Sequence, residues 1–532
     1  MAIEYDALLQ KIGGFGRYQK VLLVVLFFPA IFDAMQGFLP NFILAEHKHR
    51  CKIPNEQDSY ERNVTHHSVY NVSKCSVQYN GTSQECTEWV YDQSIFTDSL
   101  ISSLNIVCDE KEWREHLILA ALLGMFFGNI GNNLMSDLYG RKLTVCLDLI
   151  IYTIGSVPLP WTENRIALLF LRFLAGVGGV GYYQIAFILG TEQVSPQYRV
   201  AVNFLEHFIF TIGQFILCLV AYYLRDWHYL AMACGLPFLV TIFHWFFIYE
   251  SPRWLLAKGR TTEALEILKK AAKMNKVEFD FESDEIRINK EHAEPFLKSF
   301  KALFGSFRLV RRLLILAFCF FAVNLTYYGI SLNIGILGGN IYINFAISTL
   351  MELLGVTFSL ITLNRFGRKK MHCISLLIGG TSCLCTIFTS LYAPKDLYWI
   401  TIALAMIGKL AVTINFFVVY TFTAELFPTV LRGVAMGMCS TTGRIGTVSS
   451  AYIGALGKNL ETDFGSALPL IIFGSVGLIA GMISLILPET TAKSLPETVN
   501  DAATLLDNKS SEDSKHAAGS ATEMDQQNST RL

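Results

Sequence analysis

The sequence contains few charged residues. Asp, Glu, Lys and Arg make up 16% of the 532 residues, whereas a soluble protein carries about 25%. The net charge is −1, which argues against nucleic acid or another polyanion as a partner. No secretory signal peptide is evident, because the first apolar run, 21–44, is too long for one and has no clear cleavage site. We interpret this run as a retained membrane span.

Motifs of catalysis are lacking as well. We find no cluster with the spacing of metal ligands, no nucleophile elbow and no phosphate-binding loop. The string Gly176-Val-Gly-Gly-Val-Gly181 matches the dinucleotide fingerprint, but it lies inside a long apolar run and not after a strand. We interpret it as small residues that allow membrane helices to pack closely. The sequence therefore predicts a protein that is not an enzyme and needs no cofactor.

Long apolar runs are what the sequence does contain. Hydrophobic residues make up 52% of the chain, and a membrane-spanning helix needs about 20 mostly apolar residues. Because Lys and Arg are enriched in the loops near 141 and 365 and in segment 251–312, we expect these parts and both termini to be cytoplasmic. The pattern predicts an all-α membrane protein with twelve transmembrane helices, at about 21–44, 116–136, 143–160, 166–190, 203–224, 229–249, 312–332, 338–363, 371–391, 397–420, 434–455 and 467–487.

Three short charged strings recur about 230 residues later in the chain, and a steady offset of this kind indicates a duplicated unit. A membrane protein built from two similar halves is by default a transporter. The repeat predicts two pseudo-symmetric six-helix halves, 21–250 and 311–490. A cytoplasmic linker, 251–310, would join them and carry an amphipathic helix at 260–274; a cytoplasmic segment, 1–20, precedes them, and the composition of 491–532 is typical of a disordered tail. The repeated strings are 137–142 with 364–369, 192–199 with 425–432, and, more loosely, 250–252 with 488–490.

Acidic and basic residues of the repeated strings predict a cytoplasmic gate. Ion pairs between helix ends can form in one state and break in another. The alternative is that the basic residues only set the topology. The gate candidates are Asp137, Arg141, Glu192, Arg199, Arg365, Arg368, Glu425 and Arg432.

The first outside loop, about 45–115, is long and polar. Four cysteines in an oxidising compartment suggest two disulfides, and three pairings are open. They are Cys51, Cys75, Cys86 and Cys108. Three sequons in the same loop predict N-glycosylation at one or more of Asn63, Asn71 and Asn80.

Together these features resemble the major facilitator superfamily, and more specifically its organic cation, carnitine and organic anion transporter family. The resemblance covers about residues 1–500. Asn133 and Leu138 stand where the family's first motif usually has Gly and Arg, and Asn364 stands where the second copy usually has Asp. The resemblance implies the major facilitator fold, alternating access, and an inner gate weaker than usual. The strings that carry it include Gly140-Arg-Lys142, Glu192 through Arg199, Glu250-Ser-Pro-Arg-Trp-Leu255, Leu337-Gly-Gly-Asn-Ile-Tyr342 and Ala424-Glu-Leu-Phe-Pro-Thr429.

Two ionisable residues lie in the middle of apolar runs, where a charge costs about 2.5–3.5 kcal/mol. Glu352 lies in the eighth run and Arg444 in the eleventh. The resemblance implies that Glu352 is a substrate-contacting carboxylate, and that an Arg at 444 is shared with carnitine-type and anion-type members. An acid and an Arg in one cavity suit a zwitterion, because Glu352 would attract an ammonium group and Arg444 could bind a carboxylate through two hydrogen bonds. The alternative is a structural ion pair between the two.

Further polar and aromatic residues are candidates for the same cavity. Tyr327 and Tyr328 could offer ring faces to a cation. Gln184 and Gln214 could contact substrate or equally form helix–helix hydrogen bonds. Lys409 is a candidate for the cavity wall.

The chain ends in Ser529-Thr530-Arg531-Leu532, a pattern that PDZ domains bind through the terminal carboxylate, with Thr530 and Leu532 as the recognised side chains. The predicted function is a multi-pass plasma-membrane transporter of small organic zwitterions or cations, of the carnitine, betaine or amino-acid-derived amine type. The alternatives are an organic anion exchanger of the same family and a non-transporting receptor or scaffold on the same fold.

Overall fold

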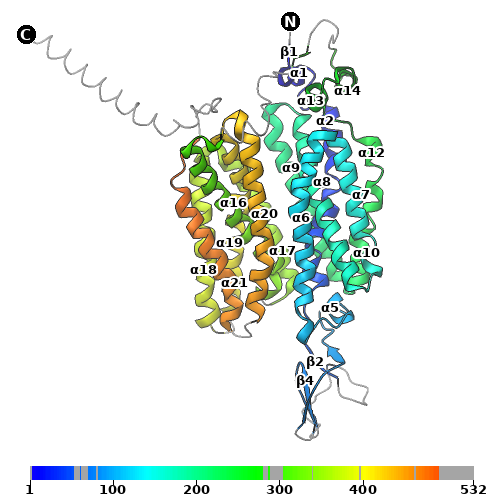
Figure 1. The fold of residues 1–532 in the computed structure, drawn as a ribbon, viewed down its shortest axis with the longest axis vertical. Coiled ribbons are helices and arrows are strands. Elements are labelled where there is room, and N and C mark those ends of the chain that lie inside the picture. The colour runs from blue at the N-terminus through cyan, green and yellow to red at the C-terminus, as the bar shows by residue number, and fades with distance from the viewer. Residues whose placement is uncertain are drawn as a thin grey trace, which may run out of the picture.

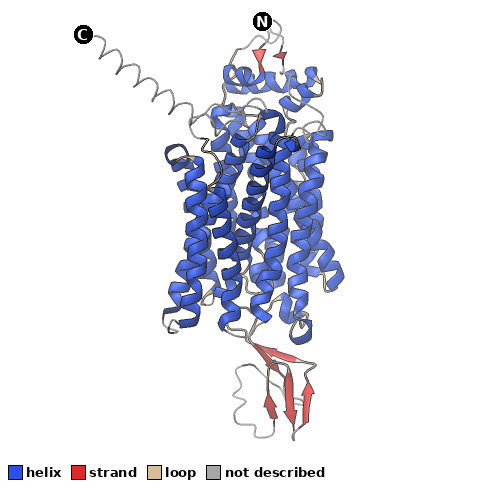
Figure 2. Cartoon of the chain, turned by 60° about the vertical axis from the view of Figure 1, so that its left-hand side comes forward, coloured by secondary structure: helices blue, strands red, loops and turns tan. Residues whose placement is uncertain are grey.

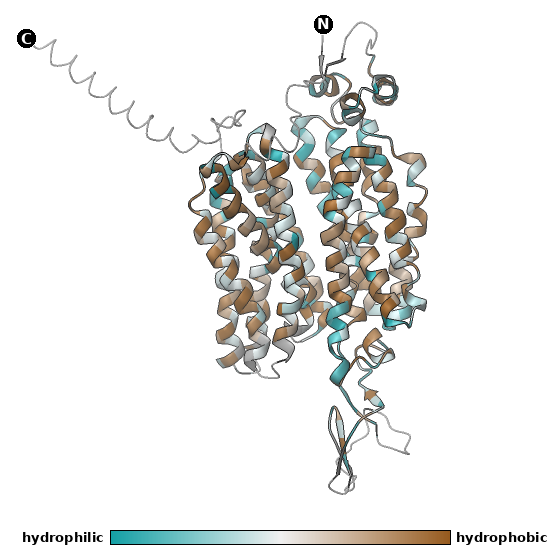
Figure 3. Ribbon diagram, viewed as in Figure 1, coloured by the Kyte–Doolittle hydropathy of each residue, from teal (hydrophilic) through white to brown (hydrophobic). Residues whose placement is uncertain are grey.

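The computed structural model describes residues 3–52, 60, 70–79, 82–278, 286–287, 303–337, 339–392, 394, 397–459 and 463–490. Two helical bundles lie side by side, one built from each half of the chain (Figure 1). Strands occur only near the ends of the bundles within these ranges, and the body consists of helices (Figure 2). Apolar residues dominate along the helices, while hydrophilic residues gather toward their ends and in the long loop (Figure 3).

Each of the twelve predicted runs overlaps a helix or a series of short consecutive helices. The first-half helices are α2 (Arg17–Phe27), α3 (Ala30–Phe38), α4 (Pro40–Ile43), α6 (Glu112–Tyr139), α7 (Arg141–Ser156), α8 (Arg165–Glu192), α9 (Arg199–Tyr223), α10 (Trp227–Gly235), α11 (Phe238–Thr241) and α12 (His244–Phe247). The second-half helices are α16 (Phe307–Leu332), α17 (Ile341–Phe366), α18 (Arg368–Tyr392), α19 (Tyr398–Leu426), α20 (Thr429–Asn459) and α21 (Asp463–Ser484).

Ten helical segments of the described chain are long and apolar enough to cross a membrane. The sixth run is not among them because it is divided into α10, α11 and α12, with Pro237 at the first break. Proline lacks the N–H that would continue the hydrogen-bond ladder. The eleventh run, α20, is long enough at 31 residues, but Gly, Ser, Thr and Arg444 make it less apolar than the others.

The long loop projects from one end of the bundles, which we call the loop face (Figure 1). Strands β2 (His49–Cys51) and β6 (Trp89–Tyr91) pair antiparallel, and β3 (Tyr70–Val72), β4 (Ser76–Tyr79) and β5 (Thr82–Glu85) form a second antiparallel sheet. Disulfides Cys51–Cys86 and Cys75–Cys108 connect them, which selects one of the three pairings. Asn71 lies in β3; Asn63 and Asn80 are outside the described residues.

At the opposite end, which we call the terminal face, short helices lie over the first-half bundle (Figure 1): α1 (Tyr5–Lys11), α13 (Pro252–Ala257) and α14 (Thr261–Asn275). The predicted amphipathic helix is α14, and it buries Ala264 and Leu268 against Leu8 of α1. Asn275, at its end, accepts a hydrogen bond from the Tyr18 amide (2.9 Å) through Oδ1. The linker is thus tied to the start of the first membrane helix. Thr530 and Leu532 are outside the described residues.

Equivalent glycines mark the same packing contact in the two halves. A Cβ on Gly213 of α9 would lie 2.3 Å from the carbonyl oxygen of Ile31 in α3. A Cβ on Gly446 of α20 would lie 2.3 Å from the carbonyl oxygen of Phe321 in α16. Such close backbone approach leaves no room for any side chain. The two glycines fix the correspondence between α9 and α20.

Candidate functional site

A cavity of about 1390 Å³ lies between the two halves. Helices α3, α6, α8 and α9 supply one wall, and α16, α17, α19 and α20 supply the other. Its lining includes Asp137, Leu314 and Gly433, which lie near the helix ends on the terminal face. The cavity therefore extends from the middle of the bundle toward the terminal face.

Aromatic side chains of the two halves pack against each other on the loop side of the cavity. The rings of Phe42 and Tyr342 stack with centroids 5.7 Å apart. Phe345 meets Phe38 edge-on at 6.0 Å and Phe42 at 5.1 Å. The Asn41 amide donates to the Ser331 carbonyl across the same junction (3.0 Å). In this state the loop face is closed.

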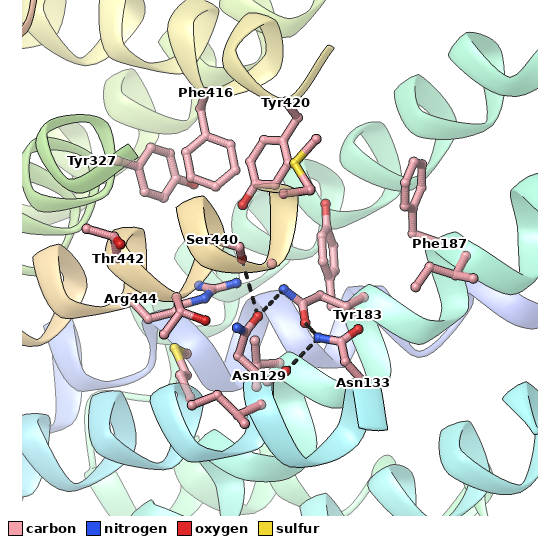
Figure 4. Close-up of a pocket in the computed structure, with 18 of the residues that line it drawn as sticks. Asn129, Asn133, Tyr183, Phe187, Tyr327, Phe416, Tyr420, Ser440, Thr442 and Arg444 are labelled. Atoms are coloured by element: carbon pink, nitrogen blue, oxygen red, sulfur yellow. Dashed lines mark hydrogen bonds between the residues drawn. The ribbon is translucent and has the colours of Figure 1, made fainter. Parts of the chain in front are cut away.

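Asn129, Gln184 and Ser440 form a polar network that crosses the cavity (Figure 4). The Gln184 amide donates to Asn129 Oδ1 (2.7 Å), and the Ser440 hydroxyl donates to the same oxygen (3.4 Å) from the other half. Asn133 donates in turn to Gln184 Oε1 (3.3 Å). Gln184 therefore lines the cavity, but both ends of its amide are engaged by the neighbouring helix α6. Asn133, unusual for the motif, belongs to this network.

Glu352 is buried and forms an ion pair with Lys409, Nζ to Oε2 being 3.1 Å. Its other oxygen accepts hydrogen bonds from Tyr327 Oη (2.9 Å) and from Gln214 Nε2 (3.0 Å). The Lys409 ammonium also donates to Ser331 Oγ and lies 3.4 Å from the centroid of the Tyr327 ring. Glu352 thus pairs with Lys409 and not with Arg444, contrary to the alternative of a Glu352–Arg444 pair. Gln214 links Glu352 to the first half.

Arg444 extends from α20 toward the cavity (Figure 4). Its Nη1 donates to Tyr328 Oη at 3.3 Å. Among the described residues, no carboxylate lies within ion-pair distance of its guanidinium. Burial of a guanidinium without a counter-ion is costly. The side chain therefore has the capacity to bind an anionic group that enters the cavity. The aromatic side chains that share this part of the lining are Tyr183, Tyr327, Tyr328, Phe416 and Tyr420.

The charged strings meet at the terminal face, but each ion pair stays within one half. Arg141 bridges Asp137 and Glu192, both at 3.2 Å. Arg368 pairs with Glu425 at 3.1 Å in the equivalent place. These contacts join helix ends inside a half, so the state that is open toward the terminal face retains them.

The third, looser string has the same structural role in both halves. A carboxylate oxygen of Glu250 accepts from the amides of Arg141 (2.9 Å) and Lys142 (3.1 Å), which begin α7. Glu489 accepts from the amides of Arg368 (3.1 Å) and Lys369 (3.3 Å), which begin α18. An acid at a helix N-terminus satisfies free amides and interacts favourably with the helix dipole.

Three other gate candidates lie elsewhere. Arg199 pairs with Asp6 of α1 at 2.8 Å rather than with Glu192. Arg432 buries its Nε and Nη2 without a hydrogen-bond partner among the described residues. Arg365 is exposed. The structure therefore places Arg199 in the contact with the N-terminal helix and Arg365 outside the charge network.

Comparisons with known proteins identify the family. A model described as "Sugar (and other) transporter" matches residues 58–501. The organic cation transporter protein of Drosophila melanogaster is 35% identical over 93% of this chain and 94% of its own. Solute carrier family 22 member 1 of Bos taurus is 31% identical over 94% of this chain and 93% of its own. This chain belongs to the organic cation transporter family, solute carrier family 22. A further member, the human organic cation/carnitine transporter 2, is 29% identical to this transporter over 93% of each chain.

Solved structures share the fold of this transporter. The xylose transporter XylE of E. coli, in an inward open conformation, has a TM-score of 0.61 at 15% identity, over 90% of this chain and 98% of that chain. Likeness at this identity shows the fold alone. The predictions of a major facilitator fold, of a multi-pass membrane transporter and of a protein that is not an enzyme are confirmed.

The sequence of the transporter did not assign three further residues to the cavity wall, and it suggested a structural or gate-associated role for two of them, Asp33 and Glu206. Asp33, Glu206 and His207 line the cavity from α3 and α9. Charged residues in apolar runs mark them as candidates, but sequence alone does not show which face of a helix points inward. Lys409, which the sequence suggested for the cavity wall, is instead buried behind Glu352 and does not line the cavity.

Proposed function

We propose that this transporter moves small organic zwitterions, of the carnitine, betaine or amino-acid-derived amine type, by alternating access in the plasma membrane. The terminal face would be cytoplasmic. The observation that carries the proposal is Arg444, a buried guanidinium in the cavity wall without a carboxylate partner among the described residues. A substrate carboxylate would supply the missing counter-ion through two parallel hydrogen bonds.

The ammonium end of the substrate needs a different partner from the one that the sequence suggested. Glu352 is already neutralised by Lys409 and accepts two further hydrogen bonds. A substrate cation would have to break this arrangement to reach it. The faces of Tyr183, Phe416 and Tyr420 line the cavity beside Arg444, and quaternary or primary ammonium groups bind aromatic faces. We therefore assign Glu352 to holding Lys409, Tyr327 and Gln214 in place, and the cation to the aromatic wall.

Organic anion exchange is the second candidate. With Glu352 balanced by Lys409, Arg444 leaves the second-half wall with one net positive charge. An anion that lacks an amine would satisfy Arg444 equally well. The name of one relative, organic cation/carnitine transporter 2, supports a zwitterionic substrate over an organic anion.

Counterflow in proteoliposomes tests the proposal. The panel contains a betaine-type zwitterion, the matching cation without a carboxylate, and the matching carboxylate without an amine. We expect Arg444→Ala to lose zwitterion exchange, while Arg444→Lys recovers part of it because one charge remains without the bidentate geometry. Arg260→Ala is the matched control, since Arg260 is exposed and pairs with Glu263 on α14.

Each outcome decides between the candidates. Full zwitterion exchange by Arg444→Ala would show that Arg444 does not bind the carboxylate. Equal exchange of the amine-free carboxylate by the wild type would favour the anion exchanger.

We also propose that the loop is extracellular and carries N-glycans at one or more of Asn63, Asn71 and Asn80, and that the ending Thr530-Arg531-Leu532 binds a PDZ-domain scaffold. A glycosidase that shifts the electrophoretic mobility of the wild type, but not of a triple Asn→Gln variant, tests the first. Deletion of Leu532 with unchanged recovery of PDZ scaffolds would dispose of the second.

A further inference from the structure

Glu206 is a carboxylate in the cavity wall for which the described part of the chain supplies no hydrogen-bond partner. It lies on α9, it is 1% exposed, and neither of its carboxyl oxygens has a hydrogen-bond partner among the described residues. An ionised carboxylate without a hydrogen bond or a counter-ion is expensive to bury, whereas the neutral acid costs much less. In its ionised form Glu206 therefore requires a cation, and no described side chain supplies one.

The groups around Glu206 make an anion there less favourable still. Asp33, on the packed helix α3, is a second buried carboxylate in the cavity wall and is close enough to repel it. Asp33 accepts one hydrogen bond, from Tyr152 Oη (2.8 Å). The titratable groups that face this region are Asp33 on α3, Tyr152 on α7, Tyr182, Tyr183 and Arg172 on α8, His207 on α9 and, across the cavity, Glu352 on α17.

Several of these neighbours already have hydrogen-bond partners. The hydroxyl of Tyr182 donates to the Leu26 carbonyl (2.9 Å), and that of Tyr183 bonds with His207 Nδ1 (3.1 Å). Arg172 is buried outside the cavity lining. No basic side chain of the described chain forms an ion pair with Glu206 or Asp33. Glu206 and Asp33 are therefore two acids of the first-half wall that no basic side chain of the described chain pairs with.

A metal ion does not fit this cluster. Among the described residues, the one group of three side chains that could hold a metal lies in the loop, at His49, Cys75 and Cys108, and two of these form a disulfide. Glu206 and Asp33 belong to no such group. Of the inorganic cations, a proton needs the fewest ligands, and a single carboxylate is enough to bind it.

The position on α9 connects Glu206 to the substrate site. Gln214, about two helical turns further along α9, donates to Glu352 in the second half. His207, next to Glu206, meets the ring of Phe417 in the second half with centroids 6.3 Å apart. By the correspondence of Gly213 with Gly446, the equivalent of Glu206 in α20 is Cys439, which is apolar and buried. The acid is therefore specific to the half that lacks Arg444.

We propose that Glu206, with Asp33 beside it, is a proton-binding site that couples substrate transport to the movement of one proton in the same direction. The carboxylate takes a proton from water when the cavity opens to the loop face. It carries the proton as the neutral acid while the cavity is closed around substrate, and releases it to water at the terminal face. No bond other than the carboxyl O–H forms or breaks. The direction rests on the proposed function, namely on a zwitterionic substrate.

The net charge of the cavity explains why substrate and proton would move in the same direction. Glu352 and Lys409 cancel, Asp137 pairs with Arg141 at the terminal face, and Arg444 balances Asp33. An ionised Glu206 would leave one net negative charge in a cavity closed around a neutral zwitterion. Closing a cavity of low dielectric around a net charge is unfavourable. The protonated Glu206 removes this charge, so the loaded transporter closes most readily with its proton bound.

Infrared spectroscopy of the reconstituted transporter, without any substrate, tests the proton site itself. We expect a pH-dependent carbonyl stretch of a protonated carboxyl group that is lost in Glu206→Gln. Asp148→Asn is the matched control, because Asp148 is equally buried with both oxygens lacking partners, yet lies outside the cavity lining. The band must persist in this control. A wild-type spectrum in which Glu206→Gln removes no titrating band overturns the proposal.

Proteoliposomes test the coupling. With the membrane potential clamped at zero, one pH unit of inward proton gradient supports up to about tenfold accumulation of a zwitterion moved with one proton. We expect Glu206→Gln to reduce accumulation to onefold while substrate counterflow continues, and Asp148→Asn to accumulate as the wild type does. Accumulation by Glu206→Gln that still follows the pH gradient, or wild-type accumulation that follows a sodium gradient instead, contradicts the proposal. Absence of zwitterion counterflow in the wild type would count against the proposed function alone, since the infrared result stands without substrate.

Discussion

Lys409 neutralises the buried carboxylate of Glu352. The sequence placed both in apolar runs, but only the structure brings them within 3.1 Å, because α17 and α19 turn these faces toward each other. A buried ion pair contributes little net stability, yet removal of one partner leaves a charge that the interior cannot solvate. The pair therefore makes the second-half wall dependent on both residues.

We expect Lys409→Met to destabilise the transporter by about 3–5 kcal/mol, because Glu352 then remains as a buried carboxylate without its cation. The double variant Lys409→Met/Glu352→Gln should regain most of this loss, since it removes the charge as well. Thermal unfolding in detergent compares the single and double variants. Equal melting temperatures for the two would contradict a structural ion pair.

The turns between α6 and α7 and between α17 and α18 are built alike. Gly140 and Gly367 adopt positive φ angles of 110° and 88°, a region that side chains with a Cβ rarely occupy. A Cβ on Gly140 would also lie 2.3 Å from Glu250 Oε2, the group that caps α7. The loose resemblance of 250–252 to 488–490 thus has a physical basis in two equivalent helix caps.

Gly140→Ala should destabilise the first half by about 1–3 kcal/mol through backbone strain, and in addition displace the Glu250 cap. Gly131→Ala on α6 is the matched control, because a Cβ there meets no atom within 4 Å; alanine favours a helix interior by up to about 1 kcal/mol. Thermal unfolding of the two variants measures the difference. A Gly140→Ala protein as stable as Gly131→Ala would show that the turn does not need glycine.

The aromatic closure at the loop face can be tested through one thiol. Cys218 on α9 donates from Sγ to the Tyr342 carbonyl (3.3 Å) and is partly buried. Tyr342→Ala removes the one ring that packs with Phe42, Phe96 and Tyr222. We expect a membrane-impermeant maleimide to label Cys218 faster from the loop face in this variant than in the wild type. Cys218→Ser identifies the labelled thiol, and unchanged labelling would show that these rings do not seal the cavity.

The whole molecule shows why some features could be predicted and others not. Apolar length alone located the helices, and the repeat gave the two halves, because both are properties of the linear sequence. The partners of Glu352 and Arg199 depend on which helix faces meet, and a period of 3.6 residues does not reveal that. The four loop cysteines also left three disulfide pairings open. Which cysteines meet depends on how the strands of the loop pair, and the sequence does not show this.

The whole molecule is in one state of the transport cycle in this structure. The loop face is closed by contacts between the halves, whereas the charge pairs of the terminal face stay inside each half. A transporter that works by alternating access must break the first set of contacts to admit substrate from the loop side. The aromatic contacts between α4 and α17 are therefore the part of the molecule that has to separate in each cycle.

Covalent locking of this junction tests the alternation of the two halves. We would place cysteines at Phe42 and Phe345, whose rings are 5.1 Å apart in the closed state, in a Cys218→Ser background, and join them with a short reversible bis-thiol reagent. Transport should fall to background after cross-linking and return after reduction, because the halves can no longer separate at the loop face. The single variants Phe42→Cys and Phe345→Cys, treated in the same way, control for modification of one thiol. Normal counterflow by the cross-linked double variant would mean that substrate reaches the cavity without separation of α4 from α17, and that this junction is a fixed hinge instead of a gate.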